Sequence, residues 1–251
     1  EDVRLNGQDA VVKVTLERDG VDPRPIRVSQ EELAEALANL DPKLRKAIEE
    51  SIERVFKVSR ANLPQETSVS LADGANVHQR WQPVDSVGLY VPGGKAVYPS
   101  SVIMNVVPAQ VAGVKRLALT SPAQKEFNGR PHPTVLATAC LLGVENVYCM
   151  GGPAAVAAFA YGLPQINFEP VSLVTGPGNI YVAAAKRALR GTIGIDSEAG
   201  TTEILVLADS SANARYIAYD LISQAEHDEA AASVLVTDSI DRKSTRLNSS
   251  H

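Results

Sequence analysis

Cysteine and aromatic residues are scarce in this chain of 251 residues, of which aromatic residues make up 5%. Its two cysteines, Cys140 and Cys149, exclude the disulfide framework of a small secreted domain. Both lie in apolar stretches, as reduced thiols of a protein core do. Stability must therefore come from a packed interior, and the chain is long enough for one large α/β domain or two ordinary ones.

Excess positive charge and long apolar runs are lacking as well. The formal net charge is −5, which leaves no basic footprint for nucleic acid or for an anionic membrane surface. No run of about 20 apolar residues is present to cross a membrane. The first residues, Glu-Asp-Val-Arg, do not resemble the start of a signal peptide. We therefore expect a cytoplasmic protein that binds small molecules, with no nucleic acid and no membrane among its partners.

The last stretch, residues 241–251, departs from the alanine- and valine-rich pattern that precedes it. It reads Asp-Arg-Lys-Ser-Thr-Arg-Leu-Asn-Ser-Ser-His, and the chain begins without methionine. We interpret 241–251 as a non-native or read-through tail. A natural disordered terminus remains an alternative.

The N-terminal third contains helical patterns without recognisable chemistry. A helix is expected over 7–20, where β-branched residues leave a strand possible. Ser29 and Glu32 form a capping box that predicts a helix over 29–40. A proline at the first helical position and apolar residues at helical spacing predict a further helix over 42–60.

Strands and helices alternate between residues 86 and 161. This order predicts a parallel sheet with helices on its faces, so the expected fold class is α/β. The strands are expected at 86–94 (running into a glycine turn), 116–120 and 146–150, and the helices at 100–113, 133–142 and 153–161.

Three glycine-rich turns are expected where strands of this sheet end. They are Pro-Gly-Gly at 92–94, Gly-Gly-Pro at 151–153 and Gly-Pro-Gly-Asn at 176–179. Ligands of parallel sheets bind beyond the carboxyl ends of the strands, where glycine lets a phosphate approach backbone N–H groups. Each turn alone could be a plain connection, and none has the Gly-x-Gly-x-x-Gly fingerprint. Together they favour a shared cleft, in which Tyr90 and Asn179 suit a cofactor that carries adenine or ribose.

A second strand–helix–strand unit is expected from residue 204 to residue 237. Its helix, expected from residue 213, carries Gln224 and His227, whose side chains at i and i+3 would lie about 5–6 Å apart at Cβ. Imidazole is a common zinc ligand, whereas an amide oxygen is a poor one, and a zinc site needs three or four ligands. The alternative is a polar turn on the exposed side of an amphipathic helix.

Four ordered motifs resemble those of the histidinol dehydrogenase family. They are Gly-Leu-Tyr-Val-Pro-Gly-Gly at 88–94, Gly-Pro-Gly-Asn at 176–179, Ala-Gly-Thr-Thr-Glu at 199–203 and Ser-Gln-Ala-Glu-His at 223–227. Each motif is weak alone, but their order over residues 6–239 makes the resemblance specific. The resemblance implies a zinc- and NAD-dependent enzyme that completes histidine biosynthesis.

The resemblance also implies site residues. Tyr90 and Asn179 would contact NAD, and Thr202 would take the place of a substrate-contacting serine. Gln224 and His227 would be two of four zinc ligands and would contact the substrate.

In the implied reaction, two successive hydride transfers to NAD oxidise L-histidinol to L-histidine. Zinc would hold the amino alcohol through its amino group and imidazole, and a base would remove the hydroxyl proton. The family's catalytic glutamate and histidine, and its two other zinc ligands, are expected beyond the end of this chain. We therefore expect no catalytic residue in these 251 residues, and no activity of this chain alone.

One departure from the family pattern concerns the cofactor. Ala154 stands where the family has glutamine in Gly-Gly-Ala-Gln, and Pro153 stands where it has alanine. The change bears on the strength of NAD binding. It leaves two alternatives: a divergent amino-alcohol dehydrogenase, or a non-catalytic α/β module that binds a nucleotide or metabolite without zinc.

The domain organisation that the resemblance implies is a Rossmann-like parallel-sheet domain inserted in a second, incomplete α/β domain. Residues 89–201 would form the glycine-rich NAD-binding domain, and 1–88 with 202–240 would form its companion. Subunits would pair as an intertwined homodimer.

Overall fold

The computed structural model describes residues 1–93, 96–198, 202–227 and 231–239, which belong to two compact units. Unit 1 comprises residues 1–198, and unit 2 begins at residue 199. Within the described residues, no helix is long and apolar enough to cross a membrane. The predicted tail at 241–251 lies outside the described residues.

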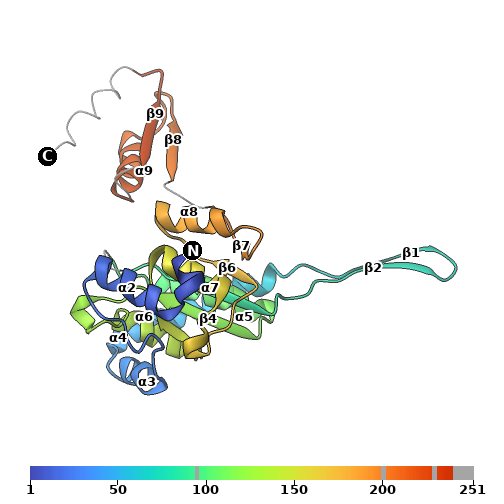
Figure 1. The fold of residues 1–251 in the computed structure, drawn as a ribbon. Helices are drawn as coiled ribbons and strands as arrows, with labels where there is room; N and C mark the ends of the chain where they lie inside the picture. Colours follow the sequence, from blue (N-terminus) through green and yellow to red (C-terminus); the bar gives the residue numbers. More distant parts are fainter. Residues whose placement is uncertain (94–95, 199–201, 228–230, 240–251) are drawn as a thin grey trace. The chain divides into compact units, whose positions relative to one another are not determined.

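Unit 1 contains most of the secondary structure (Figure 1). Its helices are α1 (Asp2–Asn6), α2 (Gln8–Asp19), α3 (Gln30–Ala38), α4 (Pro42–Ala61), α5 (Pro99–Ala112), α6 (Pro133–Leu141), α7 (Gly152–Tyr161) and α8 (Ile180–Leu189), with 3₁₀ turns η1 (Lys125–Phe127) and η2 (Pro164–Ile166). Its strands are β1 (Thr67–Ala72), β2 (Ala75–Gln79), β3 (Ser86–Tyr90), β4 (Arg116–Ser121), β5 (Val147–Cys149), β6 (Leu173–Thr175) and β7 (Gly194–Ile195).

Five strands of unit 1 form one parallel sheet in the order β5-β4-β3-β6-β7. The chain starts at β3, adds β4 and β5 on one side, and then returns to the other side of β3 with β6. This change of direction is a topological switch point between β3 and β6. The prediction of an α/β fold with a parallel sheet is confirmed.

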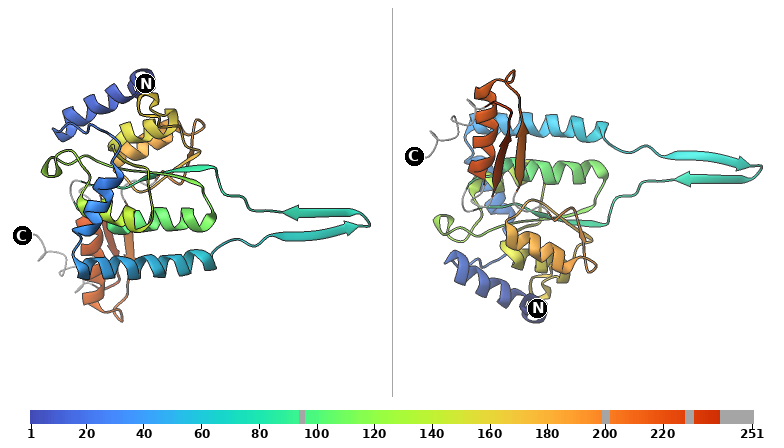
Figure 2. Two further views of the ribbon diagram at one scale, coloured as in Figure 1. Left: turned by 90° about the horizontal axis from the view of Figure 1, so that it is seen from below. Right: turned by 90° about the horizontal axis from the view of Figure 1, so that it is seen from above.

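Side chains along β3 alternate between two cores, one on each face of the sheet. Val87 and Leu89 belong to a core with α3, α4, α5 and α6, whereas Tyr90 belongs to a core with α1, α2, α7 and α8. The two helical layers can be followed in Figure 1 and, from two other sides, in Figure 2. Gly88 faces the second core, where a Cβ atom would lie 2.4 Å from the ring of Phe159. Only glycine therefore fits at that position.

Helices α3 and α4 begin where the sequence predicts. Ser29 Oγ accepts the backbone N–H of Glu32, and the Glu32 carboxylate accepts the backbone N–H of Ser29, which is the predicted capping box. Asp41 caps α4 by accepting two backbone N–H groups, and Gly20 ends α2 in a left-handed conformation. The region 7–20 is therefore a helix and not a strand.

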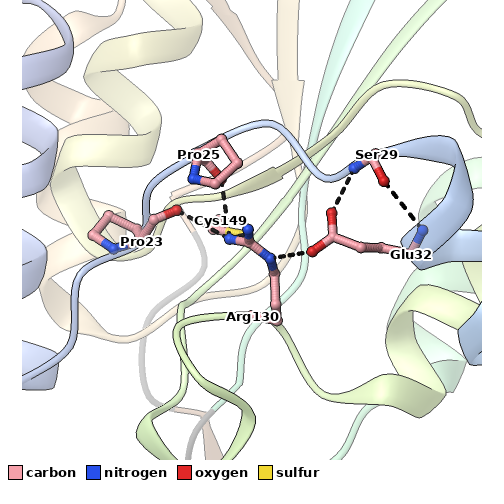
Figure 3. A network of polar contacts seen from close by, with 6 residues as sticks. All are labelled: Pro23, Pro25, Ser29, Glu32, Arg130 and Cys149. Atoms are coloured by element: carbon pink, nitrogen blue, oxygen red, sulfur yellow. Dashed lines mark hydrogen bonds and ion pairs between the residues drawn. The ribbon is translucent and has the colours of Figure 1, made fainter.

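An arginine ties the N-terminal segment to the sheet (Figure 3). Arg130 donates from Nε to Glu32 at 2.5 Å, and from Nη1 to the carbonyl oxygens of Pro23 at 3.2 Å and Pro25 at 3.0 Å. The same nitrogen lies 3.6 Å from Sγ of Cys149, at the end of β5. One cation thus fixes the chain between α2 and α3 against the carboxyl edge of the sheet.

β1 and β2 form a two-stranded antiparallel hairpin, drawn as a separate ribbon in Figure 2. Every residue of both strands is exposed. Val69 pairs with Val77 on one face of the hairpin, and Ser68 pairs with His78 on the other. Successive residue pairs therefore alternate between an apolar and a polar face. This hairpin was not predicted from the sequence.

Unit 2 contains β8 (Glu203–Leu207), α9 (Ala214–His227) and β9 (Ala232–Val236). β8 and β9 are parallel, and α9 packs on both strands, as a strand–helix–strand unit requires. The grouping of 1–88 with 202–240 in one domain, around an inserted domain of 89–201, stays a prediction. In the structure, α3 packs on α6 and α4 packs on α5 within unit 1.

Candidate functional site

The predicted glycine turns follow strands β3, β5 and β6 of the parallel sheet. The strands end at similar levels, because Tyr90 pairs with Thr120 and Ser121 pairs with Cys149 in the ladders. Thr175, the last residue of β6, pairs with Leu89. All three turns therefore lie along the carboxyl edge of one sheet, and two of them flank its switch point, where ligands of open α/β sheets bind.

Tyr90 links the first strand end to the second turn. Its ring is buried, with 4% of the residue exposed, and its hydroxyl accepts the backbone N–H of Gly152 at 3.2 Å. Burial raises the pKa of Tyr90, against the opposing effect of this hydrogen bond, so the phenol stays neutral. The structure thus gives Tyr90 a role in fixing the start of α7. Its predicted contact with NAD stays a prediction.

The third turn is pressed against the first strand end. Gly176 has φ +118°, and a Cβ atom there would lie 2.0 Å from the carbonyl oxygen of Tyr90. Three residues later, Asn179 caps α8 by accepting the backbone N–H groups of Tyr181 and Val182, both at 3.1 Å. Asn179 is exposed, and its Nδ2 atom has no hydrogen-bond partner among the described residues. The cap therefore orients an amide donor beside the switch point.

Two polar side chains next to the first turn were not predicted from the sequence. A Cβ atom on Gly93 would lie 3.3 Å from Oγ of Ser121 and 3.2 Å from Nε2 of Gln124. The hydroxyls of Ser121 and Thr120 are buried without a hydrogen-bond partner in the described structure. Buried unpaired hydroxyls are uncommon and mark sites of function or strain. The signal available in the sequence was a Thr-Ser pair at the carboxyl end of a predicted central strand.

An ion pair between a buried lysine and a partly exposed aspartate, behind the third turn, was also missed. Lys186 in α8 lies 2.6 Å from Asp196, which follows β7, and both side chains hydrogen-bond to Gly176. The sequence offered no signal for this pair, because the two residues meet only through the packing of α8 against the end of β7.

In unit 2 the structure brings Thr202 and Gln224 together. Nε2 of Gln224 donates to the carbonyl oxygen of Thr202 at 2.8 Å. This bond uses the amide nitrogen of Gln224. The other amide atom, Oε1, is the one that can bind a metal, and it takes no part in this bond. Gln224 and His227 both lie on α9, as predicted, but the side chain of His227 lies outside the described residues.

A complete metal site is not present in the described part of the chain. No group of three or more His, Cys, Asp or Glu side chains there could hold a metal ion. Residues 199–201 of the Ala-Gly-Thr-Thr-Glu motif, and Gly94 of the first turn, lie outside the described residues. The described metal donor candidate is thus the amide oxygen of Gln224.

The comparisons with known proteins agree on one family. A model of the histidinol dehydrogenase family matches residues 1–245. The histidinol dehydrogenase of Leifsonia xyli subsp. xyli is 57% identical over 238 residues, which cover 95% of this chain and 55% of that protein. The histidinol dehydrogenase of Thermobifida fusca is 59% identical over 239 residues, which cover 95% of this chain and 54% of that protein.

A solved structure is also similar. The crystal structure of histidinol dehydrogenase from Elizabethkingia anophelis matches with a TM-score of 0.88 and 33% identity, covering 98% of this chain and 56% of that one. The chain thus spans about half the length of the curated relatives it matches. The match of the family model over nearly the whole chain confirms the predicted resemblance. The chain belongs to the histidinol dehydrogenase family.

Proposed function

We propose that this chain supplies the cofactor-binding part of an NAD- and zinc-dependent dehydrogenase that oxidises L-histidinol to L-histidine with two NAD. The observation that carries the proposal is the carboxyl edge of the sheet in unit 1. There Tyr90 connects the turn after β3 to the turn after β5, and Gly176 holds the turn after β6 against Tyr90. The ends of the three strands are therefore linked to one another through Tyr90.

The turns along this edge suit a dinucleotide in their chemistry. Gly176 lets the turn after β6 lie against the end of β3, because a Cβ atom there would meet the carbonyl oxygen of Tyr90 at 2.0 Å. Asn179 directs an amide donor to the same edge, and the neutral hydroxyl of Tyr90 fixes the start of α7. NAD, when bound, supplies the acceptor of the hydride. The residues of this chain would hold and orient it.

The residues of this chain would supply only part of a zinc site. Gln224 and His227 would contribute two ligands from α9, and Thr202, fixed to Gln224 through its carbonyl oxygen, would contact the substrate. Zinc, when bound, would orient the amino alcohol. Two ligands make a weak site. We therefore assign no chemical step to the described residues of unit 2 and no catalytic residue to this chain.

The remaining parts of the proposal follow from the family. The protein would act in the cytoplasm, bind L-histidinol as a small-molecule substrate, and pair as an intertwined homodimer without nucleic acid or membrane as partner. Residues 89–201 would form the NAD-binding domain, and 1–88 with 202–240 would form part of the companion domain.

The test is NADH formation from L-histidinol, with and without zinc. It is measured for these 251 residues and for the same chain extended to the length of its relatives. We expect zinc-dependent turnover by the extended chain alone, and its loss in the extended variants Gln224→Ala and His227→Ala. A folded, zinc-loaded extended chain that makes no NADH from L-histidinol would exclude this substrate.

A second candidate is favoured by one observation. Ala154, in the first turn of α7, has only 6% of its surface exposed and offers no polar side-chain atom where the family has an amide. That change agrees with a divergent amino-alcohol dehydrogenase, or with a module that binds a nucleotide without catalysis. NAD binding by the extended chain, with turnover of another amino alcohol or with no turnover, would identify these alternatives.

A further inference from the structure

A buried lysine lies behind the third glycine turn. Lys186, in α8, has only 2% of its side chain exposed, although lysine is almost never buried without a partner. Its Nζ atom donates to the carbonyl oxygen of Gly176 at 2.5 Å and to Oδ1 of Asp196 at 2.6 Å. Nothing in the proposed function uses this cation directly.

The carboxylate of Asp196 completes a clamp on the same glycine. Its Oδ2 atom accepts the backbone N–H of Gly176 at 2.9 Å, and its Oδ1 atom accepts the backbone N–H of Ser197 at 2.6 Å. Both backbone polar groups of Gly176 are therefore held by side chains, the N–H by Asp196 and the C=O by Lys186. The clamp joins α8, the turn after β6 and the segment after β7.

The clamped residue has a conformation that glycine alone adopts readily. Its φ is +118°, and its Cα lies so close to the end of β3 that a Cβ atom would meet the carbonyl oxygen of Tyr90 at 2.0 Å. Such a backbone conformation persists only when its surroundings fix it. The turn leads directly to Asn179. A shift of Gly176 would therefore move the amide of Asn179 relative to the end of β3.

Burial of a charged lysine contributes little where stability alone is needed. The side chain of Lys186 is 2% exposed and that of Asp196 is 32% exposed, so desolvation of the lysine offsets much of the attraction between the two charges. A cation beside a carboxylate, however, can hold a backbone acceptor and a backbone donor in fixed directions at once. We propose that Lys186 and Asp196 are positioning residues that preset the Gly176 turn for the cofactor. This role rests on the proposed function.

The test measures the affinity for NAD⁺ by isothermal titration calorimetry with the 251-residue chain. Lys186→Met keeps the length of the side chain and removes the donor to both partners. We expect its dissociation constant to rise about tenfold, because a turn that is no longer fixed in advance loses more entropy on binding. Lys186→Arg keeps the cation and should recover part of the loss. Asp196→Asn is the second variant, which decides the question if Lys186→Met does not fold.

Arg116 offers a matched control at the opposite edge of the same sheet. It donates to the carbonyl oxygen of Glu169 and to Oγ of Ser86, both at 3.1 Å, and to the carbonyl oxygen of Pro170. Arg116→Met thus removes a half-buried cation that holds backbone carbonyls far from the glycine turns. It should lower the melting temperature and leave the affinity for NAD⁺ unchanged.

Three results would overturn the proposal, and one of them would also refute the cofactor site of the proposed function. If folded Lys186→Met and Asp196→Asn bind NAD⁺ as tightly as the wild type, or if Arg116→Met loses as much affinity as they do, the positioning role fails. The proposed function then stands. If the wild-type chain itself binds no NAD⁺, the cofactor site of the proposed function fails, and the positioning role fails with it.

Discussion

The ion pair between Glu32 and Arg130 gives the most direct test of how the N-terminal segment is held (Figure 3). The Glu32 carboxylate has two functions: it accepts the backbone N–H of Ser29 at 2.7 Å in the capping box, and it accepts Arg130 Nε at 2.5 Å. Glu32→Gln keeps a capping side chain and removes the charge, because glutamine also serves in a capping box. Glu32→Ala removes both functions.

The expected loss of unfolding free energy depends on how exposed the two side chains of the pair are. A hydrogen bond to a charged group contributes about 1.5–3 kcal/mol when buried, and an exposed ion pair less than about 1 kcal/mol. The side chains of Arg130 and Glu32 are 19% and 33% exposed, which places this pair between those limits. We expect Glu32→Gln to lower the free energy of unfolding by about 1–2 kcal/mol. Glu32→Ala should lower it by about 1 kcal/mol more, through loss of the cap.

The pH dependence has a defined sign. Burial would raise the pKa of Glu32, but the hydrogen bonds from Ser29 and Arg130 outweigh it and hold the pKa below its ordinary value. The charged pair therefore stabilises the fold fully above the ordinary glutamate pKa of about 4.3, and this contribution is lost as the pH falls through the lower folded pKa.

Urea unfolding of the wild type and Glu32→Gln across this pH range measures the gap between them, with circular dichroism and fluorescence compared to establish two-state behaviour. The gap should be constant near neutral pH and should close in acid. Equal unfolding free energies at neutral pH, or a gap that widens in acid, would refute the reasoning.

Three further variants or reactions test other parts of unit 1. Gly88→Ala places a Cβ atom 2.4 Å from the ring of Phe159 and should lower the urea midpoint, with a loss of about 1–3 kcal/mol. Burial raises the pKa of the Cys149 thiol to about 11, so iodoacetamide at about pH 8 should alkylate the half-buried Cys140 first. Mass spectrometry of timed samples measures the two alkylation rates, and equal rates would contradict this expectation. Tyr90→Phe removes the acceptor at the start of α7 and should lower the unfolding free energy by about 1 kcal/mol, whereas an unchanged melting temperature would contradict that role.

The sequence predicted the layered part of the fold because its elements carry local signals. Alternation of Val87 and Leu89 with Gly88 and Tyr90 places side chains in two cores, which is the pattern of a strand covered on both faces. The capping box, the cap of α4 and the helix-ending glycine act through neighbouring residues alone, so the starts of α3 and α4 and the end of α2 were predictable.

Other elements carry too little local signal. β6 and β7 contain three and two residues, which is too few for a periodic pattern, and α8 follows a turn that also fits a plain loop. The hairpin of β1 and β2 has no buried side chain, so no core shapes its sequence. These elements can be assigned only when the strands and helices that they pair or pack with are known.

The residues of the candidate site also differ in whether a local sequence signal marks them. Asn179 could be singled out because its motif is contiguous in the sequence. The structure shows it as the cap of α8, and its contact with NAD stays a prediction. Lys186 and Asp196 were not singled out, because they meet only through the packing of α8 against the end of β7. Ser121 was not singled out either, although a Thr-Ser pair at a strand end was visible in the sequence. The hydrogen bond from Gln224 to the carbonyl oxygen of Thr202 was not predicted, because the two residues are separated by the length of β8 and α9.

Position 154 bears on how this edge of the sheet can hold a dinucleotide. A helix N-terminus attracts phosphate through its unpaired N–H groups, but in α7 these are few. The N–H of Gly152 is bound to Tyr90, Pro153 has none, and the N–H of Ala155 is bonded within the first turn. The N–H of Ala154 remains, without the side-chain amide that the family has at this position. On the proposed function, the second turn would therefore contribute few donors to NAD. The fixed third turn would contribute more to affinity, because donors that are fixed in advance lose less entropy on binding.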